Sequence, residues 1–171
     1  MAKKDIIIGF IMVLLGVFFR LIPHPNNFTP VIAIALLSGA YFSSNFSKFL
    51  VPILSMIISD FFIGFYEGVW VTYLSILTSV GIGTLISLKK FQVSQTFVAA
   101  SSASFVFFFL TNLGVWAFSD MYAKDWKGLL ECYTMAIPFF QNAIIGDCIY
   151  SIIFFGAFHL FQKNALFKTA L

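Results

Sequence analysis

Eight side chains that could bind a ligand or take part in a reaction stand out in a chain that is otherwise strongly apolar. They are Arg20, His24, Asn27, Asp60, Asn112, Trp116, Asn142 and Asp147. Carboxylate, amide, imidazole and guanidinium groups bind organic ligands through hydrogen bonds and ion pairs. Inside a membrane such groups cost several kcal/mol unless they find partners, so each of them needs an explanation. We predict that they form a ligand-binding site.

Their spacing indicates depth and direction. Asp60 and Asn112 each lie six residues before the outer end of an expected span, about 9 Å deep at the rise of an α-helix. Asp147 falls nearer the middle of the bilayer. Asn112 and Trp116 are four residues apart and share a helix face, where an amide and an indole could meet a flat ligand. Asn142 and Asp147 are five apart, roughly 140° around a helix, so they cannot both face one narrow pocket without distortion.

Each residue also has a structural interpretation. Arg20 either reaches the outer interface or pairs with Asp60. Asn112 can form a hydrogen bond to a neighbouring helix. Trp116 can be an anchor at the edge of the membrane. Asp147 is either a neutral acid bonded to a backbone carbonyl or a functional group, and we favour function.

The segment 20–29 contains His24 between two prolines and, further on, Asn27. Its position after the first apolar stretch makes it a loop. His24 is then either a solvent-exposed loop residue or part of a lid over the pocket.

The sequence lacks the familiar patterns of catalytic residues. Ser59-Asp60 and Ile145-Gly146-Asp147 lack the Tyr-Asp and Gly-x-Gly-Asp patterns of intramembrane aspartyl proteases, and a rhomboid-like serine protease would need Gly-x-Ser-x-Gly and a membrane histidine. HExxH, Walker and CxxC sequences do not occur either. We expect no enzyme activity, no metal and no cofactor.

The composition identifies the solvent of most side chains as lipid. Of 171 residues, 60% are apolar, 24 are Phe and only 10% are charged, against roughly 25% charged in soluble domains. The net charge of +3 comes from scattered basic residues and gives no signal for nucleic-acid binding. Cys132 and Cys148 lie on one expected helix about 24 Å apart, beyond disulfide reach.

The whole chain, 1–171, is expected to be one all-α membrane domain of six helices. The expected spans are 5–22, 30–44, 49–66, 69–88, 95–118 and 129–162, the last with a bend at Pro138. The first is an uncleaved span, because no small-x-small cleavage site follows it.

The positive charges predict the orientation. With the N-terminus inside, the cytoplasmic side has seven lysines and the outer side has three basic residues. The seven are Lys3, Lys4, Lys48, Lys89, Lys90, Lys163 and Lys168, and the three are Arg20, Lys124 and Lys127. We therefore expect both termini in the cytoplasm and a multi-pass protein of the bacterial inner membrane.

Four sequence blocks carry a resemblance to a known family. They begin with Arg20-Leu21-Ile22-Pro23-His24-Pro25-Asn26-Asn27-Phe28-Thr29-Pro30, continue with Ser59-Asp60-Phe61-Phe62-Ile63-Gly64-Phe65 and Asn112-Leu113-Gly114-Val115-Trp116-Ala117, and end with 132–142 and Gly146-Asp147. Over nearly its whole length the chain resembles an uncharacterised family of small bacterial membrane proteins described as transporters. That family is distantly similar to the S components of energy-coupling-factor (ECF) vitamin transporters.

The resemblance implies six helices, a ligand pocket in the outer half, and partners in the form of a membrane coupling subunit and two cytoplasmic ATPases. The expected function is a substrate-capture subunit or small transporter for a vitamin-like organic metabolite. Asp60 and Asp147 would favour cationic or donor groups in that ligand, and Arg20 could meet a carboxylate. The alternative is a structural or assembly membrane protein whose polar residues lock helices together.

Overall fold

The computed structural model describes residues 3–86, 88 and 91–163, and within them the protein is all-helical with no strand. The predicted all-α class with six helices is confirmed. The helices are α1 (Lys3–Leu21), α2 (Val31–Tyr41), α3 (Asn45–Ile63), α4 (Val69–Gly83), α5 (Val93–Phe118) and α6 (Trp126–Lys163).

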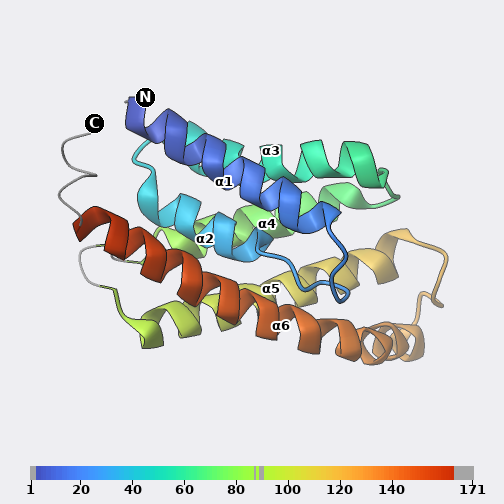
Figure 1. Ribbon diagram of the computed structural model, residues 1–171. Helices are drawn as coiled ribbons and strands as arrows, with labels where there is room; N and C mark the ends of the chain where they lie inside the picture. The colour runs from blue at the N-terminus through green and yellow to red at the C-terminus, as the bar shows by residue number, and fades with distance from the viewer. Residues whose placement is uncertain (1–2, 87, 89–90, 164–171) are drawn as a thin grey trace.

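The six helices form three layers. α1 packs with α3, α2 with α4, and α5 with α6, and the α2–α4 pair lies between the other two (Figure 1). Successive helices run in opposite directions, so the connections 22–30, 64–68 and 119–125 share one end of the bundle. We call this the Arg20 end, because Arg20 lies there in the last turn of α1.

α2 is the centre of the molecule, and its sequence explains why. Its residues from Val31 to Gly39 are all buried, and they are apolar or small on every side of the helix. Such a helix has no face suited to water and is stable only in lipid or enclosed by other helices. Here it is enclosed. Gly39 lies against the backbone of Val80, and Gly83 of α4 lies against the backbone of Leu36. The absence of side chains at these two glycines lets α2 and α4 approach backbone to backbone.

Three helices, α3, α5 and α6, are long and apolar enough to cross a membrane. α1 has 19 residues but carries charged residues at both ends, while α2 and α4 are shorter. Large apolar side chains point outward from the bundle, including Phe10 at 63% exposed and Phe61 at 74%. An apolar exterior of this kind is what a lipid environment requires.

The remaining sequence predictions about topology have different outcomes. Cys132 and Cys148 are both free, as predicted. α6 is continuous with Pro138 inside it, and the bend there stays a prediction. Lys89, Lys90 and Lys168, which entered the charge count, lie outside the described residues. The orientation with both ends inside therefore also stays a prediction.

Candidate ligand-binding site

A half-open cavity of about 520 Å³ lies at the Arg20 end of the bundle. All six helices or their connections contribute to its wall, and the α1–α3 and α5–α6 layers stand on opposite sides of it. Its volume falls in the range of sites that hold small organic molecules. It is the strongest candidate for a binding site in the described part of the chain.

The connection between α1 and α2 forms the most polar part of the wall. It contributes His24, Asn26, Asn27 and Thr29. The turn is closed by a hydrogen bond of 3.0 Å from the Phe28 amide to the Pro25 carbonyl. Asn27 has a φ of 62°, a left-handed conformation that Asn tolerates better than most residues. The Asn at this position thus helps the turn to form.

Phe28, in the same connection, anchors the segment to α6. Its ring lies 5.5 Å from that of Tyr150, centroid to centroid. A Cβ atom on Gly146 would come within 3.0 Å of the Phe28 ring, so the glycine provides the space in which the ring packs. The segment 22–30 therefore extends down onto α6 instead of lying freely over the bundle.

α5 and α6 form one long wall of the cavity. Its residues repeat at helical spacing: Phe107 and Thr111 on α5, and Phe139, Ala143 and Asp147 on α6. Steps of four residues keep side chains on one helix face. This wall is mainly apolar, with the Asp147 carboxyl group as its most polar feature.

The opposite wall, formed by α3, α4 and their connection, combines apolar and polar side chains. Met56, Ile63 and Ile76 give it apolar surface, while Tyr66 and Thr72 add hydroxyl groups. The Tyr66 hydroxyl lies 2.7 Å from Thr72 Oγ1. The cavity can therefore contact both the apolar body and the polar groups of an organic ligand.

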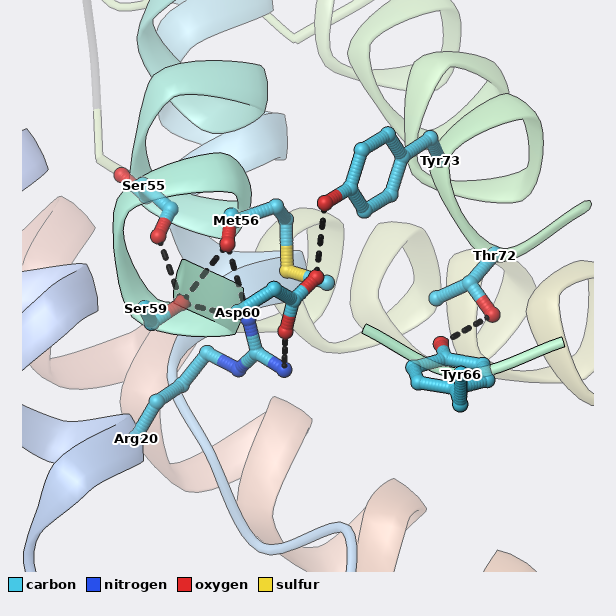
Figure 2. Close-up of polar contacts among 8 residues, drawn as sticks. All are labelled: Arg20, Ser55, Met56, Ser59, Asp60, Tyr66, Thr72 and Tyr73. Atoms are coloured by element: carbon cyan, nitrogen blue, oxygen red, sulfur yellow. Dashed lines mark hydrogen bonds and ion pairs between the residues drawn. The ribbon is translucent and has the colours of Figure 1, made fainter. Parts of the chain in front are cut away.

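Arg20 connects the cavity to a polar cluster between helices (Figure 2). Its Nη2 atom lies 2.7 Å from Asp60 Oδ1, which confirms the pairing of Arg20 with Asp60 as one of the two sequence interpretations. Its Nη1 donates to Ser59 Oγ at 2.5 Å and to the Met56 carbonyl at 3.3 Å. The Tyr73 hydroxyl donates to the other Asp60 oxygen at 2.7 Å. The Arg20 cluster thus joins α1, α3 and α4.

Burial determines what this cluster can do. Asp60 is fully buried, whereas the Arg20 side chain is 14% exposed and lines the cavity. Both carboxylate oxygens of Asp60 are engaged and its charge is matched by Arg20. Asp60 therefore positions Arg20, and Arg20 is the member of the pair that a ligand can reach.

Asp147 has a different environment. It is 3% exposed and lines the cavity, and its carboxylate accepts a hydrogen bond from the Ser104 hydroxyl of α5. Among the described residues, no Lys or Arg forms an ion pair with it. Of the two interpretations of Asp147, the neutral acid bonded to a backbone carbonyl is not what the structure shows, since its partner is the Ser104 hydroxyl.

Four predicted site residues do not line the cavity: Asp60, which lies behind Arg20, and Asn112, Trp116 and Asn142. Asn112 Nδ2 donates a hydrogen bond of 2.7 Å to the Phe108 carbonyl of its own helix. The predicted alternative, a hydrogen bond from this amide to a neighbouring helix, is therefore not what the structure shows. Trp116 Nε1 donates to the Ala123 carbonyl in the following connection at 2.9 Å. Asn142 is half-buried beside Ala143. The structure thus brings Arg20, His24, Asn27 and Asp147 to one cavity, with Asp60 behind Arg20.

Sequence reasoning missed several wall residues that helical spacing could have found. Phe139 and Ala143 lie eight and four residues before Asp147, on the same face of α6. Counting back from Asp147 in steps of four would have identified both. Ser104 and Tyr73 had no such signal, because their role depends on which helices are neighbours.

The described residues include no cluster of side chains that could bind a metal ion. In the ranges that the structure describes, no group of three or more His, Cys, Asp or Glu residues is placed to hold an ion. The polar groups of the cavity are instead arranged singly along its wall.

Comparison with known families gives one match. The profile of a family of unknown function, DUF6580, matches residues 1–170. The chain belongs to this family. No curated protein and no solved structure matches it. Membership of an uncharacterised family is thus confirmed, whereas similarity to ECF S components receives no support from these comparisons and stays a prediction.

Proposed function

We propose that the protein is a membrane substrate-capture subunit or small transporter for an organic, vitamin-like metabolite. The observation that carries the proposal is the cavity of about 520 Å³ at one end of an apolar helical bundle. Its wall combines apolar side chains with separate polar groups, which is typical of sites for small organic molecules.

The proposal includes an orientation and a location. The Arg20 end would face outward from a bacterial inner membrane, with six spans and both chain ends in the cytoplasm. α2 fits this arrangement although it has 11 residues, because it is enclosed by other helices and need not match the bilayer thickness. The cavity would then receive its ligand from outside the cell.

Energy for uptake would come from partners. The sequence contains no Walker motif, so ATP-driven uptake would use separate ATPases and a coupling subunit of the energy-coupling-factor type. The resemblance of the four sequence blocks to relatives of S components supports this part of the proposal. Expression with and without such a module, followed by uptake assays, tests it.

The experiment that tests capture is identification of the ligand that copurifies. The full chain is purified in mild detergent and its bound small molecules are identified by mass spectrometry. Ala143→Trp fills the cavity wall, whereas Ile145→Trp adds the same ring to an exposed position of the same helix. We expect the ligand to be present in the wild type and in Ile145→Trp and absent from Ala143→Trp. Equal amounts in all three would contradict the proposal.

One observation favours a structural function as the second candidate. The Arg20 cluster joins three helices through buried polar contacts, which is what a helix lock would do. Ligand-dependent stabilisation separates the two candidates, because a ligand that binds only the folded protein raises the free energy of unfolding. A lock protein would show no stabilisation by any fraction of small molecules extracted from its host.

A further inference from the structure

One carboxyl group at the cavity has no cationic partner among the described residues. Arg20 and Asp60 cancel each other at a distance of 2.7 Å. The Asp147 carboxyl group lies in the wall with one hydrogen bond, to Ser104, and no cationic partner in the described part of the chain. A buried ionised carboxylate without a counter-charge is strongly unfavourable.

A ligand can supply the missing charge. Asp147 is 3% exposed, and the surface that it keeps faces the cavity. Resting on the proposed function, we infer that the cavity takes an organic cation whose positively charged nitrogen lies against Asp147. An ion pair formed there is shielded from water and strengthened by the low dielectric of its surroundings.

The neighbouring wall supports a cation at this position. Phe107 and Phe139 line the same cavity, from the two helices that hold Ser104 and Asp147. The faces of aromatic rings attract organic cations such as ammonium groups. Aromatic rings and a carboxylate together form a common type of site for a cationic nitrogen.

Arg20 determines what the rest of the ligand can be. The guanidinium has five N–H donors, and the contacts with Met56, Ser59 and Asp60 use three of them. The remaining donors can bond an oxygen acceptor of the ligand at its other end. The class of ligand is thus a cationic organic molecule with an apolar body and at least one oxygen acceptor.

Probes that share a skeleton and differ in charge test the inference. The first series is tryptamine, tryptophol and indole-3-propionate, and the second is benzamidine, benzamide and benzoate. Dissociation constants are measured at pH 7 with the purified full chain, freed of copurified ligand. We expect the cation of each series to bind at least about tenfold more tightly than its neutral partner, a difference of about 1.4 kcal/mol.

Asp147→Asn should remove that tenfold preference, and Asp120→Asn, on the exposed connection before α6, should keep it. Equal binding of cationic and neutral probes by the wild type, no binding of either cation, or a preference that survives Asp147→Asn would each overturn the inference. The wild-type comparison needs no variant, so it holds even if Asp147→Asn fails to fold.

The outcomes also separate this inference from the proposed function. A copurified ligand that is lost in Ala143→Trp but has no cationic nitrogen would keep the capture function and overturn the cation. A bound cation that is retained in Ala143→Trp would place binding outside the cavity and overturn both.

Discussion

The two buried aspartates of this protein occupy opposite kinds of environment. Asp60 is surrounded by partners: Arg20 from α1 and Tyr73 from α4 each contact one of its oxygens. Asp147 has the Ser104 hydroxyl and the cavity. A polar group with all its partners stabilises a fold, whereas one that lacks them is retained where function requires it.

The surroundings of the two residues differ in the same way. The Arg20 cluster holds α1, α3 and α4 together by polar contacts. Near Asp147, the connection 22–30 is held by packing, with the Phe28 ring against Gly146 and Tyr150. We therefore expect the first region to be sensitive to the loss of charge and the second to be sensitive to changes of volume.

The largest expected effect comes from Asp60→Asn. It leaves the mostly buried Arg20 guanidinium without a counter-charge, and we expect the free energy of unfolding to fall by about 3 kcal/mol. Titration from mild to denaturing detergent measures it, with Asp120→Asn as the exposed control. Adding Arg20→Met to Asp60→Asn removes both charges and should recover at least half of the loss. If the double variant is less stable than Asp60→Asn alone, the charge pair is not what stabilises this region.

Gly146→Leu tests the packed region. The added side chain takes the space of the Phe28 ring, and we expect a loss of about 2 kcal/mol from overpacking. Gly81→Leu is the matched control, since a Cβ atom there meets nothing within 4 Å. The same detergent titration compares them. A tolerated Gly146→Leu would mean that the connection 22–30 does not depend on this contact.

To predict a site residue, the sequence must give both its position along the helix and the rotation of the helix about its own axis. Helix rise predicted a depth for each polar residue, with Arg20 nearer the outer surface than Asp60, and the structure shows that the two side chains nevertheless pair. Rotation about the helix axis was not fixed. Thr111 and Ala143 line the cavity in place of their neighbours Asn112 and Asn142, a difference of one residue or about 100°.

The reason for this error is physical. In a soluble protein the apolar face indicates which way a helix points, but in these helices nearly all faces are apolar, and the hydrophobic pattern gives no direction. Polarity is then the only sequence signal for which residues line a pocket, and it favours every polar side chain equally. Asn112 instead satisfies its amide within its own helix, at the Phe108 carbonyl. The argument that Asn142 and Asp147 cannot share a pocket used angle alone, and it is confirmed.

The six helices themselves were easier to predict. Charges and turn residues interrupt the apolar stretches, and most helix bounds fall within about four residues of the predicted ones. The central place of α2 was less accessible, because a short apolar stretch suggests partial insertion as readily as enclosure. Its burial depends on the contact of Gly39 with α4, which is a property of the assembled bundle.

Tyr73→Phe sharpens the comparison at Asp60. It removes the hydrogen bond of 2.7 Å to one carboxylate oxygen and leaves the ion pair with Arg20. We expect a loss of about 1.5 kcal/mol, the lower part of the range for bonds to charged groups. Tyr122→Phe, in the connection before α6, is the control. A loss equal to that of Asp60→Asn would show that the hydroxyl, and not the arginine, is the main partner of this carboxylate.

The smallest expected effect on stability belongs to Asp147→Asn. The amide oxygen can still accept the Ser104 hydrogen bond, and the substitution removes a carboxyl group that has no cationic partner among the described residues. In ligand-free protein we expect the free energy of unfolding to change by less than about 1 kcal/mol, and in the stabilising direction if the carboxylate is ionised. The detergent titration is run after mass spectrometry has shown that no ligand remains. A loss as large as that of Asp60→Asn would mean that both aspartates hold the bundle together, and the contrast between them would disappear.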